Sequence, residues 1–532
     1  MPRYGRTALA SLVLVPLVAG GFIWQARSDR DGAHLFDQVL SLVSDRFVDT
    51  LDQSALYEKA AEGLVHELND PYTELLQPKK LAEFSRHTGG RYGGVGMEIS
   101  PDPAGGVVVA RVFPHTPAEE AGVVEGDRIV AVDTSSALGW KINQVSDYLV
   151  GTPGTKVMVK FVRPGVAEPL VFHFTRAIIH IPAVPYSIML DGSVAYIPLQ
   201  QFNEDATDDL ESAIRQLVIK QGAKGVVLDL RDNPGGILDQ ALSVSNVFLR
   251  QGQEIVSVRG RNAETQEYPT KTQPLAPSVP LVVLTNGNSA SASEIVAGAL
   301  QDHDRALVVG TTSFGKGLVQ TLYPLDGGYA LKMTTAKWYT PSGRSIQKER
   351  KLLPDGEFIE VHPDSLETDS ARKARPAFKS DAGRIVYGGG AITPDVVVKP
   401  DTFTTAEQQF NRTLAPKVQA VLQTLSSYAI DLKSQVGSNK DFTVKPEWRA
   451  EFYRRLQAAG VTIPRAQYDS VGGYVDKLLG HRVAVTAFGD SIAKRRELGD
   501  DVQLKKAVDL LEKGQTQKDL FVVAQQQPRA SR

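Results

Sequence analysis

Two short apolar runs, each ended by a polar turn, limit the fold of this chain most tightly. They read KGVVLDLRDNPGG at 224–236 and VPLVVLTNG at 279–287. A strand with one wet face alternates polar and apolar residues, whereas a strand buried on both faces is continuously apolar, as in the parallel sheets of α/β proteins. The two runs therefore predict strands buried on both faces of an α/β sheet, within a domain that we expect to span 177–400.

The regions on either side of this domain have different patterns of apolar residues. Residues 33–90 place apolar side chains near the 3.6-residue period of a helix. Residues 91–176 consist of β-branched runs separated by Gly and Pro, which predicts a small β-rich module. The helical period returns over 401–532. We therefore expect a multidomain α+β protein with helical N- and C-terminal regions, and a polar surface insertion at 348–386 in the α/β domain.

The first 27 residues read as an export segment. Arg3 and Arg6 precede an uncharged span from 7 to 26. A membrane-spanning helix needs about 20 apolar residues and a cleavable signal peptide only about 7–15, so the length favours an uncleaved signal anchor. We therefore expect the N-terminal segment in a membrane and the rest of the chain in the cell envelope, on its periplasmic or extracytoplasmic face.

Composition excludes some classes of function. The formal net charge of -2, without a basic run, argues against a protein that covers nucleic-acid phosphates. The chain has no cysteine, so it can hold no thiolate metal site and no cysteine nucleophile. The 42% of hydrophobic and 23% of charged residues are those of a folded globular protein.

The segment ALVVGTTSFGKGLVQT at 306–321 nearly matches a phosphate-binding P-loop. A P-loop needs a Ser or Thr after its lysine to bind magnesium. Here Gly317 follows Lys316, and the run after it, GLVQTLYPL, predicts a strand and not the helix whose N-terminus would face the phosphates. An ATP-dependent function therefore stays a disfavoured alternative.

A serine-rich turn lies upstream, in TNGNSASASEIVAGALQD at 285–302. A predicted strand at 281–285 ends there and a helix begins. Free N–H groups at a helix start, beside an exposed hydroxyl, suit an activated serine with donors for an oxyanion. The alternative is that Ser289, Ser291 and Ser293 only cap and pack the helix.

An activated serine needs a base. None of the nine histidines lies in a local motif that suggests catalysis or metal binding, and His303, between two aspartates, reads as a solvated turn residue. A lysine can serve if burial lowers its pKa enough to leave a neutral amine. Lys316, between two glycines and among apolar residues, is the candidate.

Taken together, the segments SASASEIVAGALQD, FGKGLVQ, LDLRDNPGG and WYTPSGRSIQ resemble the C-terminal processing (tail-specific) peptidases, the serine proteases of family S41. The resemblance covers about 33–400 in family order, and more loosely the C-terminal helical region. It implies a ClpP/crotonase-like protease core at 177–400, with a PDZ domain inserted at 91–176. It implies no metal and no cofactor.

The resemblance also assigns roles to single residues. It implies that Ser291 is the nucleophile, that Lys316 is the base and that Gln320 orients the lysine. The main-chain N–H groups of Gly236 and Ala292 would form the oxyanion hole. Residues four apart on a strand point to the same side, so Lys316 and Gln320 can face the same cleft.

The PDZ resemblance rests on YGGVGMEI at 92–99. It implies that the amides of Gly94, Val95 and Gly96 hold a peptide C-terminus while the peptide adds as a strand. We therefore expect an exported serine endopeptidase that binds protein and peptide substrates by their C-termini and cleaves them through an acyl-enzyme.

Three points stay open in this interpretation. The alternative function is a non-catalytic envelope PDZ adaptor or scaffold, against which the intact Ser291, Lys316 and Gln320 argue. A homo-oligomer through the C-terminal helical region is compatible with the resemblance. The insertion at 348–386 departs from the family pattern and could form a lid or a contact surface.

Overall fold

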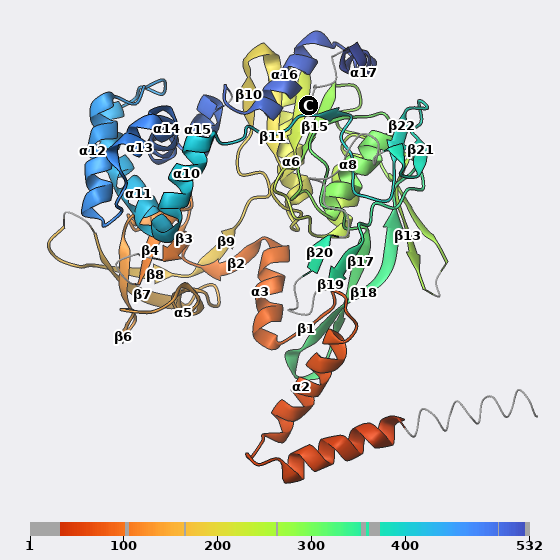
Figure 1. Ribbon diagram of the computed structural model, residues 1–532, viewed down its shortest axis with the longest axis horizontal. Helices are drawn as coiled ribbons and strands as arrows, with labels where there is room; N and C mark the ends of the chain where they lie inside the picture. Colours follow the sequence, from red (N-terminus) through yellow and green to blue (C-terminus); the bar gives the residue numbers. More distant parts are fainter. Residues whose placement is uncertain are drawn as a thin grey trace, which may run out of the picture. The chain divides into compact units, whose positions relative to one another are not determined.

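The computed structural model describes residues 32–101, 106–163, 166–261, 264–352, 358–360, 373–497 and 499–526 (Figure 1). The chain divides into two units. The smaller unit consists of the described part of 1–78 together with 320–334, and the larger unit of 79–319 and 335–532.

The smaller unit contains a helix over 32–46, α2 (Gln53–His66) and β1 (Glu74–Leu76). It also contains most of β17 (Leu318–Pro324) and the first half of β18 (Ala330–Tyr339). β1 pairs antiparallel with this half of β18, with Glu74 opposite Lys332.

The larger unit is built around a six-stranded sheet, in the order β10-β11-β12-β15-β16-β23. β10 is antiparallel to β11, and the other strands are parallel. The strands are β10 (Ile188–Leu190), β11 (Val194–Pro198), β12 (Gly225–Asp229), β15 (Leu281–Thr285), β16 (Leu307–Gly310) and β23 (Val396–Val397). The two apolar runs of the sequence are β12 and β15, which are strands buried in the sheet, as predicted, and pair in parallel.

Helices cover both faces of this sheet, which explains the unbroken apolar runs (Figure 1). Val226 and Leu228 belong to a core that includes apolar residues of α6, α7 and α8, whereas Val227 between them packs with Leu504 and Leu511 of α16. The helices are α6 (Ala206–Ile214), α7 (Leu238–Asn246), α8 (Ala292–Asp302), α16 (Val502–Lys513) and α17 (Gln517–Gln526). The last helices of the chain thus complete the α/β layers.

A second sheet and two hairpins adjoin this core. β13 (Glu254–Gly260) pairs with β14 (Gln266–Pro269) and with the second half of β18. The insertion at 348–386 contributes the hairpins β19 (Arg350–Leu352)–β20 (Phe358–Glu360) and β21 (Ala377–Lys379)–β22 (Ile385–Tyr387).

The prediction for His303 was wrong. Its side chain is 9% exposed, with Nδ1 2.8 Å from Asp381 and Nε2 2.6 Å from the carbonyl of Glu254. Since Asp381 belongs to the insertion, His303 fastens the insertion to the core.

The β-rich module is an antiparallel sheet in the order β3-β4-β5-β7-β8, with β6 beside β5. β2 (Arg91–Gly94) and β9 (Ala177–His180) pair with each other where the chain enters and leaves the module. The other elements are β3 (Met97–Pro101), β4 (Val107–Val112), α4 (Pro117–Glu120), β5 (Arg128–Val132), β6 (Ser135–Ser136), α5 (Ile142–Leu149), β7 (Lys156–Val162) and β8 (Leu170–Thr175). A core of its own, with Val109, Val132 and Phe161 fully buried, holds it together.

The remaining helices include α3 (Pro78–Gly89), which precedes the β-rich module. After the α/β sheet follow α10 (Thr405–Leu414), α11 (Val418–Val436), α12 (Pro446–Ala458), α13 (Arg465–Ser470), α14 (Gly472–Phe488) and α15 (Asp490–Glu497). They share an aromatic-rich core that includes Phe410, Trp448 and Phe452.

The predicted location needs correction. In the described part of the chain, no helix combines the length and the apolar character that crossing a membrane requires. The signal anchor or signal peptide predicted at 1–27 lies outside the described residues. The expectation of a membrane-anchored protein of the cell envelope therefore has no support in the structure.

Candidate active site

Three of the predicted site segments follow three neighbouring strands of the parallel sheet. The turn with Gly236 follows β12, Ser291 follows β15, and Lys316 follows β16. Because parallel strands end at the same edge of a sheet, their carboxyl ends bring these segments together.

Ser291 stands where β15 gives way to α8, in a strained conformation with φ 53° and ψ -111°. A positive φ is costly for a residue other than glycine, and residues held in sparsely populated conformations cluster at active sites. Ser289 and Ser293 are fully buried, and their hydroxyls donate to the carbonyls of Leu230 at 2.7 Å and Asn233 at 2.9 Å. Ser291 is only half-buried, so of these three serines it is the one that a substrate can reach.

A single buried carboxylate joins the backbones of Ser291 and Lys316. Oε2 of Glu294 accepts hydrogen bonds from the main-chain nitrogens of both residues, each at 2.9 Å, so the two nitrogens lie no more than twice that distance apart. Oε1 accepts from the hydroxyl of Ser313 at 2.5 Å and the N–H of Gly315 at 2.7 Å. Burial raises the pKa of Glu294, and the four hydrogen bonds act against that shift.

The main chain around Lys316 is held from the other side as well. Its carbonyl accepts from the indole N–H of Trp338 at 3.1 Å, and the N–H of Gly317 donates to the side-chain oxygen of Gln347 at 2.8 Å. Gly315 has φ 86°, which glycine adopts without strain. These contacts fix the backbone that carries the half-buried lysine.

The glycine turn after β12 lies against Ser291. A β-carbon at Gly235 would come within 2.9 Å of the β-carbon of Ser291, so the close approach requires glycine. The N–H groups of Gly236 and Ala292 find no hydrogen-bond acceptor among the residues that the structure describes. Two main-chain donors without an acceptor, next to a serine, are suited to a developing oxyanion.

Arg231 anchors the same turn. Its guanidinium donates to Asp229 at 2.6 Å, to Asp501 at 2.8 Å and to the side-chain oxygen of Gln503 at 3.0 Å. Asp501 also accepts from the N–H of Leu504 at the start of α16. The C-terminal helices therefore help to hold the glycine turn in place.

Gln320 belongs to the smaller unit. There its side-chain amide donates to the hydroxyl of Thr334 at 3.3 Å. Its predicted role, to orient Lys316, stays a prediction.

The predicted peptide-binding loop lies between β2 and β3. Gly96 has φ 89°, and the carbonyl of Val95 accepts from Ala118 at 2.8 Å. The N–H groups of Val95 and Gly96 have no acceptor within the described ranges. β3 is an edge strand of its sheet and contacts α5. Gly94, the last residue of β2, completes a loop that leaves donors beside an open strand edge.

Known proteins share these motifs. A model of peptidase family S41 matches residues 193–358, and a model of the PDZ domain matches residues 108–163. A carboxy-terminal-processing protease of Bartonella bacilliformis is 42% identical over 316 residues, which make up 59% of this chain and 72% of that protein. The chain belongs to peptidase family S41. It has an S41 protease fold with a PDZ domain and is a serine-type endopeptidase, as predicted.

Two other similar proteins are also named C-terminal processing proteases. The carboxy-terminal processing protease CtpB of Bacillus subtilis is 34% identical, over 61% of this chain and 68% of that protein. Among solved structures, the photosystem II D1 C-terminal processing protease is 32% identical, over 62% of this chain and 85% of that chain, with a TM-score of 0.36.

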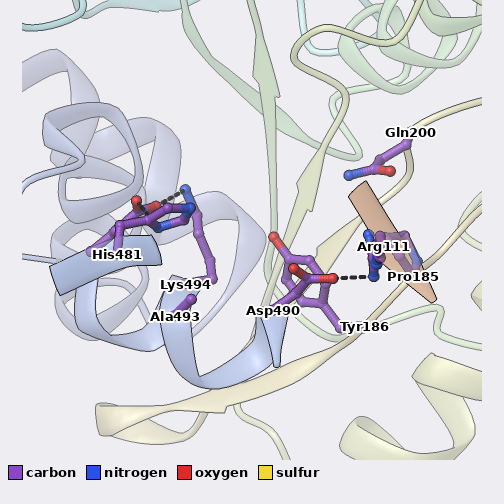
Figure 2. A pocket seen from close by; sticks show the side chains of 9 residues that line it. Arg111, Pro185, Tyr186, Gln200, His481, Asp490, Ala493 and Lys494 are labelled. Atoms are coloured by element: carbon purple, nitrogen blue, oxygen red, sulfur yellow. Dashed lines mark hydrogen bonds and ion pairs between the residues drawn. The ribbon is translucent and has the colours of Figure 1, made fainter. Parts of the chain in front are cut away.

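A cavity of about 250 Å³ lies elsewhere in the larger unit of this S41 peptidase. Figure 2 shows Asp490 pointing at Arg111 of the PDZ domain, and His481 beside Lys494. Nδ1 of His481 lies 2.5 Å from Glu497, which also lines the cavity. The charged groups of the cavity thus pair with one another, and none of the predicted site residues lines it.

Glu294 is the site residue that the sequence analysis missed. It stands three residues after Ser291, in the S-x-x-E pattern of a capping box, so its bond to the serine backbone could have been predicted. Its bonds to 313–316 could not, because that segment reaches it only through the pairing of β15 and β16.

Replacing Glu294 by glutamine is expected to lower kcat about 100-fold. The amide nitrogen cannot accept, so two of the four donors around it lose their acceptor, at about 1–3 kcal/mol each. Steady-state cleavage of an unfolded protein, together with thermal unfolding, measures the effect. Glu211→Gln, at a half-exposed helical ion pair, is the control, and an unchanged kcat in Glu294→Gln would contradict the role of this carboxylate.

Proposed function

We propose that this S41 peptidase cleaves peptide bonds with Ser291 as nucleophile and Lys316 as base, and that its PDZ domain selects substrates by their C-termini. The observation that carries the proposal is the carboxylate of Glu294, which binds the main chains of both residues. Cleavage of an unfolded protein by the wild-type chain and by Ser291→Ala tests it.

In this mechanism the hydroxyl oxygen of Ser291 attacks the substrate carbonyl carbon while its proton passes to the neutral amine of Lys316. The N–H groups of Gly236 and Ala292 bind the oxyanion that forms. When the C–N bond breaks, the lysine returns the proton to the leaving amine, and an ester on Ser291 remains. Water then attacks the ester carbonyl carbon while the same amine takes one of its protons. The bond between that carbon and the oxygen of Ser291 breaks, and the lysine returns the proton to the serine oxygen.

Gln320 completes the proposal. Its side-chain oxygen can accept a hydrogen bond from the amine of Lys316 and so direct the lone pair of that amine at the serine. The support for this role is the FGKGLVQ motif; Lys316 itself precedes β17, which begins at Leu318. The adaptor alternative is not favoured, since the family match and the relatives are proteases.

The PDZ domain is proposed to hold a free peptide carboxylate at 94–96. The open N–H groups of Val95 and Gly96 support this role, and so does the edge strand β3, to which a peptide can add in an extended conformation.

Amidating the C-terminus of a peptide is expected to weaken its binding about 10-fold or more, because the loop then loses hydrogen bonds to a charged group, worth about 1.5–3 kcal/mol. Calorimetry or fluorescence anisotropy on the full chain with Ser291→Ala, which is expected not to cut the peptide, gives the two affinities. Equal affinity for the acid and the amide would leave the PDZ domain without this role.

Finer details of the fold are also proposals. The parallel sheet with helices on both faces supports a ClpP/crotonase-like core. The limits between 33–90, 91–176, 177–400 and 401–532 are supported by the change of structure near each of them. Within 401–532, however, α16 and α17 pack on the sheet of 177–400. Self-association through 401–532 is a separate expectation, which sedimentation of the chain checks.

A further inference from the structure

The insertion at 348–386 has no part in the function proposed above, yet its first strand lies beside the candidate site. β19 begins at Arg350, which is opposite Glu360 of β20. The side chain of Arg350 is only 8% exposed, and arginine is rarely buried without partners that require it.

Two partners of Arg350 lie on the loop that carries the proposed catalytic base. Its guanidinium donates to the carbonyls of Phe314 at 2.8 Å and Gly315 at 3.2 Å, the two residues directly before Lys316. The same group lies over the ring of Phe314, 4.0 Å from the centroid. Glu360 Oε1, at 3.3 Å, partly balances the buried charge.

The other main-chain groups of this loop are held by the core. Glu294 takes the N–H groups of Gly315 and Lys316, and Trp338 binds the carbonyl of Lys316. The carbonyls of 314 and 315 are the ones that the insertion binds, through Arg350 and, for 315, also through the N–H of Lys348. The insertion thus supplies the contacts on the carbonyl side of the loop.

We propose that Arg350 is a positioning residue for the catalytic lysine: by binding the carbonyls of Phe314 and Gly315 it keeps the backbone of Lys316 in register with Ser291. The inference rests on the proposed dyad. Gly315 is the weak point of the loop, because glycine can rotate its peptide planes at little cost. A fork of two donors on consecutive carbonyls stops that rotation, which a lysine with its single donor head cannot do as well.

The test compares the wild type, Arg350→Gln, Arg350→Lys and Lys316→Ala by steady-state cleavage of a fluorogenic peptide, together with thermal unfolding. Arg350→Gln is expected to lower kcat about 10- to 100-fold, as the loss of hydrogen bonds from a charged group suggests. KM should change less than about twofold, because substrate binding is not touched. The kcat of Arg350→Lys should lie between that of Arg350→Gln and that of the wild type.

The matched control is Lys379→Gln, an exposed cation on β21 of the same insertion, which should behave as the wild type. An active Lys316→Ala would refute the dyad itself. If Lys316→Ala is inactive but Arg350→Gln keeps its kcat, the dyad stands and the inference on Arg350 fails. The inference on Arg350 also fails if the loss of activity in Arg350→Gln equals the loss of folded protein, or if only KM changes. Arg350→Lys keeps the charge beside Glu360 and remains a usable test if Arg350→Gln does not fold.

Discussion

Replacing Ser291 by alanine is expected to lower cleavage of an unfolded protein by about 10⁴-fold or more, the scale seen when a serine nucleophile is removed. The physical reason is that Ser291 is the reachable serine of the turn, strained into a positive φ and placed between the glycine turn and the lysine loop. Gel analysis of a cleavage time course, with kcat/KM from a fluorogenic peptide, measures the loss.

Ser289→Ala and Ser293→Ala are the matched controls, two residues to either side in the same motif. Ser293→Ala loses its buried hydrogen bond to the carbonyl of Asn233. Ser289→Ala loses its bond to the carbonyl of Leu230 and the bond that its hydroxyl accepts from the N–H of Asn286. Each bond is worth about 1 kcal/mol of stability. Both should keep a substantial part of the activity with a lower thermal midpoint. If Ser289→Ala is inactive and Ser291→Ala is active, the nucleophile is Ser289, and the assignment of Ser291 is refuted.

The sheet could be predicted from the sequence because its signal is local. The continuous apolar runs at 225–228 and 279–284 indicate that both faces of the sheet are covered, and the structure places helices on both. What covers the second face could not be predicted. α16 arrives there from more than 200 residues beyond β15, and helical periodicity gives a helix an apolar stripe but not the surface on which the stripe packs.

The candidate site also has a part that the local sequence predicts and a part that it does not. A serine at a helix start and a lysine between glycines follow from the chemistry that the motifs display, and the family resemblance selects Ser291 among the three serines. The contacts that hold these two residues in place relative to each other cannot be predicted from the motifs. Glu294 reaches the lysine loop only because β15 and β16 are neighbours, and Arg350 reaches it only because the insertion folds back as a hairpin. His303 was misread for this reason too, since its partners lie 49 and 78 residues away.

Lys316→Arg is expected to be as inactive as Lys316→Ala, with cleavage lowered by about 10³-fold or more. The dyad needs an amine without its extra proton, and arginine stays protonated at any usable pH. A phosphate-binding lysine, by contrast, needs only a positive charge, which arginine keeps. The pair of substitutions therefore separates a base from a phosphate clamp, the two readings that the sequence of the 306–321 segment left open.

The pH dependence of cleavage is a second, independent test of whether Lys316 acts as a base. Because the ammonium form of Lys316 cannot accept the proton of the serine, kcat/KM of the wild type should rise with pH as the amine loses its proton. ATP and magnesium should change neither the rate nor the profile. Lys332→Arg, at an ion pair with Glu74 in the smaller unit, is the control for exchanging a lysine by arginine and should stay active. An active Lys316→Arg, or cleavage that depends on ATP, would refute the dyad, because the residue would then act through a charge that arginine supplies equally well.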